Sequence, residues 1–184
     1  MNTPFPYQKA TAIRLLALDV DGVLTNSNLL FNQAGDFAKA FHVQDGFGLR
    51  LLMKSDIDVA IITGKQSGIV LHRMQDLGIQ HIYQNQAHKM LAYEDLKQKC
   101  DLTDQHIAYM GDDLPDLKVM KTAGLGIAVA NADPSLHQHA DWVTTRIGGQ
   151  GAVRDVCQAI LEAQGKWQSI VDTYLTHGTW IDAL

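Results

Sequence analysis

Short apolar runs alternate with amphipathic stretches along most of the chain. Each apolar run ends at a polar residue or a glycine, as in IRLLALD (13–19), IDVAIIT (57–63) and HIAYMGD (106–112). The stretches between the runs carry apolar residues at helical spacing, as in KQSGIVLHRMQDLG (65–78). Continuous apolar runs are typical of strands buried on both faces, so this alternation predicts an α/β, Rossmann-like parallel sheet with helices on both faces. Further strands are expected at HIYQ (81–84), GLGIAVA (124–130) and WVTT (142–145).

One segment does not follow this alternation. Residues 26–43, NSNLLFNQAGDFAKAFHV, contain two short apolar stretches around a QAGD turn. This pattern predicts a β-hairpin rather than a crossover helix. Because the segment follows the first strand, the hairpin could lie over the carboxyl end of the sheet as a flap.

The chain divides into a predicted domain over residues 1–165 and a C-terminal tail over 166–184. The tail contains Trp167, Tyr174 and Trp180 but has no clear pattern of its own. Large aromatic side chains on a terminal segment usually need a surface to pack on. Packing on a neighbouring subunit and a disordered tail are both compatible with this sequence.

Composition and net charge exclude some classes of function. The chain has 184 residues, of which 46% are hydrophobic, and a formal net charge of −5. The acidic balance argues against nucleic acid and anionic membrane surfaces as partners. No apolar run approaches the length of a membrane span, and the N-terminus lacks the pattern of a signal peptide, so we expect a cytoplasmic protein. Cys100 and Cys157 lack metal-ligand spacing and are expected to be reduced packing residues.

Carboxylates gather where two of the expected strands end. Asp19 and Asp21 follow the first apolar run, and the motif GDDLPD (111–116) follows HIAYM. If the two strands are neighbours, these carboxylates converge, and burying them without a cation would be costly. Oxygen ligands without clustered histidines or thiolates suit Mg²⁺. Exposed aspartates that cap helices are the alternative for either motif taken alone.

Two further strand ends supply groups that could hold an oxyanion. In IITGK, Thr63 offers a hydroxyl and Gly64 offers a backbone N–H. Lys89 follows the run HIYQ and begins the next helix, from which its ammonium could reach inward. Each signal is weak alone, but the order of the motifs along the chain adds weight.

This order of motifs resembles the haloacid dehalogenase-like superfamily of phosphatases over nearly the whole chain. It comprises DVDGVLT (19–25), TGK (63–65), Lys89 and GDDLPD (111–116). The resemblance implies that Asp19 is the nucleophile, forming an aspartyl phosphate. It also implies that Asp21 is the general acid and base.

The same resemblance implies roles for the remaining motif residues. Thr63 and Lys89 would hold the phosphoryl oxygens. Mg²⁺ would be bound by Asp19, Asp112 and the main-chain carbonyl of Asp21. Asp113 and Asp116 would support the metal site.

Spacing and two further stretches indicate a subgroup. The intervals between Asp19, Thr63 and Lys89 are too short for a cap domain, and cap-less members commonly oligomerise. The stretches FHVQDGFG (41–48) and GGQGAVRDVCQAILEAQGKW (148–167) resemble the 3-deoxy-D-manno-octulosonate 8-phosphate phosphatases, which are cap-less tetramers that act in lipopolysaccharide biosynthesis.

That resemblance implies a homotetramer and a sugar acid phosphate as substrate. Candidate substrate-binding residues are Thr63, Gly64, Lys65, Lys89, His42, Asp45, Gly46 and Arg154. Arg154 could instead form a surface ion pair on its helix. Lys65 stands where relatives often have arginine, so it keeps the charge but loses the bidentate geometry of a guanidinium.

Other functions remain open at the level of sequence. A related phosphatase could act on sialic acid or KDN 9-phosphate instead. A receiver module that accepts a phosphoryl group in signalling has a similar layout, but lacks an acidic residue two positions after its nucleophile. A non-catalytic scaffold is disfavoured because all four motif groups are filled.

Overall fold

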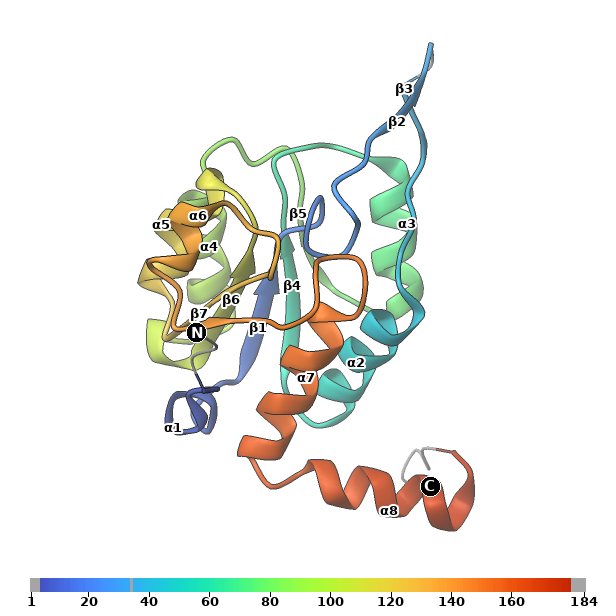
Figure 1. The fold of residues 1–184 in the computed structure, drawn as a ribbon, viewed down its shortest axis with the longest axis vertical. Helices are drawn as coiled ribbons and strands as arrows, with labels where there is room; N and C mark the ends of the chain where they lie inside the picture. The colour runs from blue at the N-terminus through green and yellow to red at the C-terminus, as the bar shows by residue number, and fades with distance from the viewer. Residues whose placement is uncertain (1–3, 34, 180–184) are drawn as a thin grey trace.

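Six parallel strands form the central sheet of the computed structural model, which describes residues 4–33 and 35–179. Their spatial order is β5-β4-β1-β6-β7-β8 (Figure 1). β1 lies between β4 and β6, with Leu15 level with Asp58 on one side and Ile107 on the other. The strands are β1 (Leu15–Leu18), β4 (Asp58–Ile62), β5 (His81–Tyr83), β6 (Ile107–Gly111), β7 (Leu125–Ala128) and β8 (Trp142–Val143).

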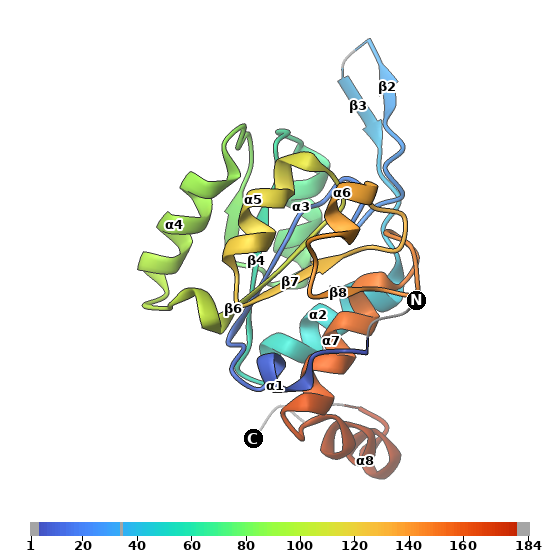
Figure 2. The same cartoon turned by 60° about the vertical axis from the view of Figure 1, so that its left-hand side comes forward.

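Helices cover both faces of the sheet, which confirms the predicted α/β fold. One layer consists of α2 (Val43–Lys54), α3 (Gly68–Leu77) and α7 (Ala152–Ala163). The other consists of α4 (Lys89–Lys99), α5 (Leu114–Thr122) and α6 (Pro134–His137) (Figures 1 and 2). The short α1 (Tyr7–Ala10) packs against α7, and a 3₁₀ turn, η1 (Asp104–His106), leads into β6.

Burial explains the apolar runs in the sequence. Every residue of β1, β6 and β7 is buried, because helices lie against both faces of these central strands. From β1 the chain moves outward through β4 to β5, and it then crosses to the far side of β1 to form β6. The connections therefore diverge at β1 and β6, so a crevice is expected at the carboxyl ends of these two strands.

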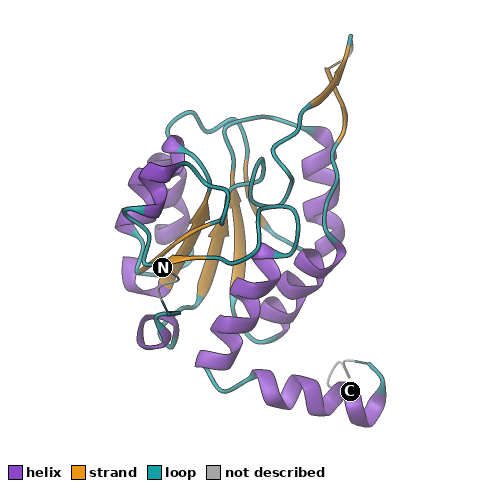
Figure 3. Cartoon of the chain, in the orientation of Figure 1, coloured by secondary structure: helices purple, strands orange, loops and turns teal. Residues whose placement is uncertain are grey.

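The segment between β1 and α2 forms a hairpin, as predicted. Its strands are β2 (Leu30–Asn32) and β3 (Gly35–Ala38), which pair antiparallel. The hairpin extends away from the body of the molecule (Figures 1 and 3). Its apolar side chains are largely uncovered, with Phe31 61% and Phe37 67% exposed.

Among the described residues no cap domain covers the sheet, and no helix is long and apolar enough to cross a membrane.

The C-terminal tail contains a helix that the sequence pattern did not indicate. α8 (Trp167–His177) buries Ile170, and Trp167 and Tyr174 pack partly against the core of the same chain. The expectation of a tail without a defined element was therefore wrong for these residues, while Trp180 lies outside the described part. Both cysteines are free, with Cys157 buried in α7, as expected.

Candidate active site

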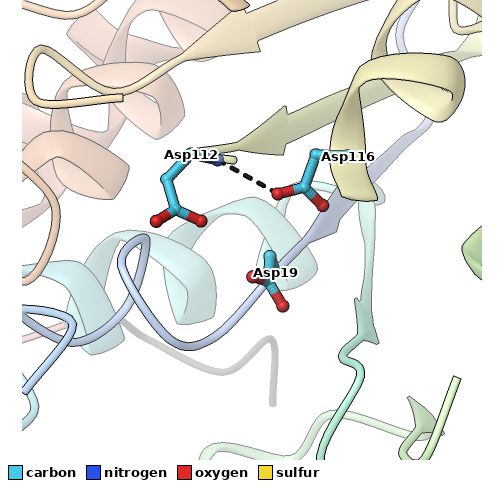
Figure 4. Close-up of side chains that lie close together, drawn as sticks. All are labelled: Asp19, Asp112 and Asp116. Carbon is cyan, nitrogen blue, oxygen red and sulfur yellow. Dashed lines mark hydrogen bonds between the residues drawn. The ribbon is translucent and has the colours of Figure 1, made fainter. Parts of the chain in front are cut away.

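Three carboxylates meet at the carboxyl ends of β1 and β6. Asp19 directly follows β1, Asp112 directly follows β6, and Asp116 lies in the first turn of α5. One oxygen atom from each carboxylate lies within 4.8 Å of the other two (Figure 4). Asp116 is fixed locally, because its Oδ2 accepts hydrogen bonds from the backbone N–H of Asp112 at 3.1 Å and of Asp113 at 3.4 Å. The convergence expected from the sequence is therefore present.

A buried lysine joins two of these carboxylates. Lys89, the first residue of α4, is only 5% exposed. Its Nζ lies 3.0 Å from Asp19 Oδ1 and donates a hydrogen bond of 2.6 Å to Asp116 Oδ1. The hydroxyl of the fully buried Tyr109 donates to the same Asp116 oxygen at 2.5 Å. Asp116 thus has donors on both oxygens and acts as an anchor for Lys89.

The turn after β1 packs directly on Asp112. Gly22 has φ +104°, a conformation that glycine adopts without strain. A Cβ atom at this position would lie 1.9 Å from Asp112 Oδ2. Thr25 stabilises the turn, since its Oγ1 accepts from the N–H of Gly22 at 3.3 Å. The glycine of the DVDGVLT motif is therefore required by the close approach of two loops.

Crowding of negative charge changes the acid–base behaviour of the site. Burial, and next the charge of Asp116, raise the pKa of Asp19 to about 6, although Lys89 acts in the opposite direction. Burial, and next the charge of Asp19, raise the pKa of Asp112 to about 7. Burial acts to lower the pKa of Lys89, but the charges of Asp19 and Asp116 outweigh it and the pKa is raised. The cluster thus carries more negative charge than one lysine can compensate.

A cavity of about 340 Å³ opens above this cluster. It is lined by residues from every motif group predicted from the sequence, namely Asp19, Asp21, Thr63, Gly64, Lys65, Lys89, Asp112, Asp113 and Asp116. Thr63 is 3% exposed and lies at the end of β4, where its backbone is held by bonds to Tyr83 and Gln86. The Asp21 carboxylate accepts a hydrogen bond from Lys39, which follows β3 of the hairpin.

The donor set fits Mg²⁺. The ligands on offer are all oxygens, and burial beside other carboxylates raises the pKa of both Asp19 and Asp112, so a bound cation would favour their ionised forms. Asp116 already accepts four hydrogen bonds, from Lys89, Tyr109 and two backbone N–H groups. Asp19 and Asp112 are therefore the side chains that would hold the ion.

The remaining predicted sugar-binding residues do not line this cavity. Asp45 is buried in α2 and accepts hydrogen bonds from the N–H of Gly151 at 3.2 Å and of Arg154 at 2.8 Å, so it caps the start of α7. Burial raises the pKa of Asp45, although these two N–H groups favour its ionised form. His42 Nδ1 lies 3.9 Å from Asp45 Oδ2. Gly46, the next residue of α2, lies beside them.

Arg154 lies nearby on α7, between two aromatic rings. Its guanidinium is 5.7 Å from the centroid of Phe47 and 5.1 Å from that of Trp167. Sugar binding by His42, Asp45, Gly46 and Arg154 stays a prediction. Within one subunit these four residues form a cluster that is separate from the carboxylates of the cavity.

Sequence reasoning missed two residues that complete the site. Tyr109 anchors Asp116 through its hydroxyl. Its position in the otherwise apolar run HIAYM could have indicated such a contact, because a buried hydroxyl needs a hydrogen-bond partner. Lys39 binds Asp21 from the hairpin, and its spacing from the motif gave no indication of this contact.

Comparisons with known proteins agree with this geometry. Residues 73–154 match the family model of haloacid dehalogenase-like hydrolases. The 3-deoxy-D-manno-octulosonate 8-phosphate phosphatase of Escherichia coli K12 is 50% identical over 158 residues, which cover 86% of this chain and 84% of the relative.

Solved structures give the same result. The enzyme of that name from Moraxella catarrhalis, in complex with a magnesium ion, a phosphate ion and a KDO molecule, has a TM-score of 0.89 and 46% identity, covering 91% of this chain and 97% of that one. The cobalt-bound Haemophilus influenzae enzyme has a TM-score of 0.89 and 38% identity, covering 94% and 100%.

Fold, crevice and carboxylate cluster define a cap-less hydrolase of the haloacid dehalogenase-like class. Within this class the chain belongs to the family of the 3-deoxy-D-manno-octulosonate 8-phosphate phosphatases.

Proposed function

We propose that this protein is a Mg²⁺-dependent phosphatase that hydrolyses 3-deoxy-D-manno-octulosonate (Kdo) 8-phosphate to Kdo and phosphate, in the biosynthesis of lipopolysaccharide. The observation that carries the proposal is the buried arrangement of Asp19, Lys89 and Asp116 beside Asp112, in a chain 50% identical to an enzyme of that name.

Asp19 is the proposed nucleophile. Its carboxylate would attack the phosphorus atom, breaking the bond to the sugar oxygen and forming an aspartyl phosphate that water later cleaves. A carboxylate repels a phosphate dianion, so the approach needs positive charge. Lys89 provides part of this charge, and Mg²⁺ held by Asp19 and Asp112 would provide the rest when bound. Thr63 and the N–H of Gly64 would orient the phosphoryl oxygens.

Asp21 is the proposed general acid and base. It would give a proton to the departing sugar oxygen and then take one from the attacking water. In the structure its carboxylate is paired with Lys39. This pair would have to open or shift when Asp21 turns to the substrate, so the end of the hairpin, where Lys39 follows β3, is expected to move during turnover.

Phosphate release from a panel of substrates tests the proposal. The panel contains Kdo 8-phosphate, sialic acid 9-phosphate, KDN 9-phosphate and a pentose 5-phosphate, each with Mg²⁺ and with EDTA. We expect Mg²⁺-dependent release with the highest kcat/KM for Kdo 8-phosphate, and a loss of at least about 10³-fold in Asp19→Asn. The exposed Asp172→Asn on α8 is the matched control. Preference for a 9-phosphate would support the proposed phosphatase mechanism but reject Kdo 8-phosphate as the substrate.

We also propose that the protein is a cytoplasmic homotetramer assembled through its hairpin. The exposed apolar side chains of Leu30, Phe31 and Phe37 support this, because such groups gather at protein interfaces. Light scattering after size-exclusion chromatography tests the assembly. The double variant Phe31→Ser/Phe37→Ser should yield smaller species, whereas Leu91→Ser, at an equally exposed position on α4, should not.

A further inference from the structure

Two sequence motifs that the proposed mechanism does not use meet between α2 and α7. Asp45 lies in FHVQDGFG (41–48), and Gly151 and Arg154 lie in GGQGAVRD (148–155). The Asp45 residue is 1% exposed, and burying a carboxylate is costly unless its oxygens are hydrogen-bonded. Here each oxygen has one backbone donor, the N–H of Gly151 for Oδ2 and that of Arg154 for Oδ1. Asp45 thereby fastens the start of α7 to α2.

The chain just before α7 packs on the turn that follows β1. Residues 144–151 connect β8 to α7 and are called here the β8–α7 loop. The N–H of Gly149 in this loop donates a hydrogen bond of 2.9 Å to the carbonyl of Val23. A Cβ atom on Gly148 would lie 1.7 Å from the main-chain oxygen of Gly22. The two backbones are thus in direct contact, with no room for a side chain between them (Figure 1).

A second contact fastens the β8–α7 loop to the same two helices. Arg146, within the loop, donates from Nε to Asp155 Oδ2 on α7 at 2.8 Å. Its Nη1 donates to Gln44 Oε1 on α2 at 3.2 Å, and Gln44 directly precedes Asp45. The loop is therefore held by a buried carboxylate at its end and by a partly exposed guanidinium nearer its middle.

The position of the turn matters because Asp21 lies in it. Gly22 directly follows Asp21, and Val23 is the next residue. A general acid must lie within hydrogen-bond reach of the departing oxygen, and a displacement of about 1 Å can lower a rate by about 10²-fold. Thr25 Oγ1 also stabilises the turn, by accepting from the N–H of Gly22. That bond lies within the turn and moves with it, whereas the bond from Gly149 ties the turn to the helices.

We propose that Asp45 is a positioning residue for the general acid. Through the start of α7 and the β8–α7 loop, it fixes the turn that carries Asp21. The inference rests on the proposed function, in which Asp21 protonates the departing sugar oxygen. Asp45 does not line the catalytic cavity, so it acts without touching the substrate. The buried part of the motif FHVQDGFG thus serves catalysis rather than recognition of the sugar.

Leaving groups of different basicity test the proposal. A sugar alkoxide needs a proton as it departs, whereas 4-nitrophenolate is a stable anion and departs without one. Asp45→Asn keeps the size of the side chain but replaces one acceptor oxygen by an amide nitrogen, which cannot accept a hydrogen bond. We expect the ratio of kcat for Kdo 8-phosphate to kcat for 4-nitrophenyl phosphate to fall about tenfold or more, with both KM values little changed. Asp21→Asn should lower the same ratio further.

A third substrate separates positioning from recognition of the sugar. A pentose 5-phosphate has an alkoxide leaving group but lacks the rest of the Kdo molecule. If Asp45 positions Asp21, Asp45→Asn lowers kcat for the two sugar phosphates by factors that agree within about threefold. A rise in KM for Kdo 8-phosphate alone would show that Asp45 contributes to recognition of the sugar, and would overturn the proposal.

Two further variants guard against effects on folding. Tyr93→Phe removes a buried hydroxyl that donates to Asp104, at the opposite end of β6 from the cavity, so it should lower Tm without changing the kcat ratio. Arg146→Met loosens the β8–α7 loop from a partly exposed position and should lower the ratio in the same direction as Asp45→Asn. Equal losses on the sugar and nitrophenyl substrates in Asp45→Asn, or in Arg146→Met if Asp45→Asn does not fold, would overturn the proposal.

The variant Asp21→Asn distinguishes failure of this inference from failure of the proposed function. If Asp21→Asn lowers the kcat ratio but Asp45→Asn and Arg146→Met do not, the proposed function stands and the positioning role is rejected. If Asp21→Asn leaves the ratio unchanged, the proposed mechanism and the positioning role are both rejected. A native enzyme active on the pentose 5-phosphate but not on Kdo 8-phosphate would reject the proposed substrate, and the ratio measured with the pentose ester would decide the role of Asp45.

Discussion

Replacing Asp112 by asparagine removes one of the negative charges that crowd the crevice. Burial and the neighbouring Asp19 raise the pKa of Asp112 from an ordinary 3.8 to about 7 in the metal-free protein. Since the folded protein holds this proton more tightly than the unfolded chain does, stability falls as pH rises from about 4 to about 7 and stays low above. At about 1.4 kcal/mol per pH unit the full cost is about 4 kcal/mol, and partial exposure to solvent reduces it to about 2 kcal/mol.

Asp112→Asn should therefore stabilise the metal-free protein while it abolishes activity. In EDTA at pH 8 we expect a gain of about 2 kcal/mol in the free energy of unfolding, or a few degrees in Tm. The gain should shrink as the pH falls toward about 4, because the native carboxyl group is then protonated in the folded protein and increasingly protonated in the unfolded chain. Added Mg²⁺ should raise the Tm of the native protein but have little effect on the variant, because a ligand stabilises only a protein that binds it.

Urea unfolding at pH 4.5 and pH 8, with EDTA or with Mg²⁺, measures these quantities. The exposed Asp172→Asn on α8 is the control and should change stability by less than about 0.5 kcal/mol at either pH. If Asp112→Asn were less stable than the native protein at pH 8 in EDTA, or if its effect did not vary with pH, the account of charge crowding would be wrong.

Three further predictions follow from the buried contacts of the site. Lys89→Met leaves Asp19 and Asp116 without their cation and should cost about 3–5 kcal/mol at pH 8. The loss should be smaller at acidic pH in urea unfolding, and a loss independent of pH would contradict it. Tyr109→Phe removes one donor from Asp116 and should lower stability by about 1–2 kcal/mol and kcat by about tenfold, with KM little changed in steady-state assays. Gly22→Ala would place its Cβ atom 1.9 Å from an oxygen of Asp112, so it should give inactive protein with Tm lowered by at least about 5 °C; native-like activity would refute the packing of this turn.

The sequence allowed the strand ends to be predicted, but not the partners that each side chain finds. The apolar runs indicated where β1 and β6 end, so the meeting of Asp19 and Asp112 followed from the rule for parallel sheets. Tyr109 lies in the same run as its buried neighbours, and only the structure shows that its hydroxyl reaches Asp116. The contact between Lys39 and Asp21 is harder to predict from sequence, because the path of a hairpin depends on its turn and its packing rather than on the periodicity of apolar residues.

The sequence failed for other reasons to predict the role of Asp45 in α2 and the presence of the helix α8. His42, Asp45 and Gly46 belong to a motif whose resemblance suggested sugar binding, yet Asp45 caps α7 through two backbone N–H groups. A residue type suited to binding a ligand is equally suited to capping a helix, and sequence alone does not separate the two roles. α8 has few core contacts, so its apolar positions gave a weak helical pattern.

The pairing of β1 with β6 also has a consequence for how the chain matures during synthesis. Asp19 is made early, but the strand that carries Asp112 to its side is completed only after more than half of the chain has been translated. Because contacts distant in sequence close late, a nascent chain truncated before β6 cannot assemble the proposed magnesium site, however well its first strands and helices have formed. Retention of Mg²⁺ would thus report that the central pairing of the sheet has been made.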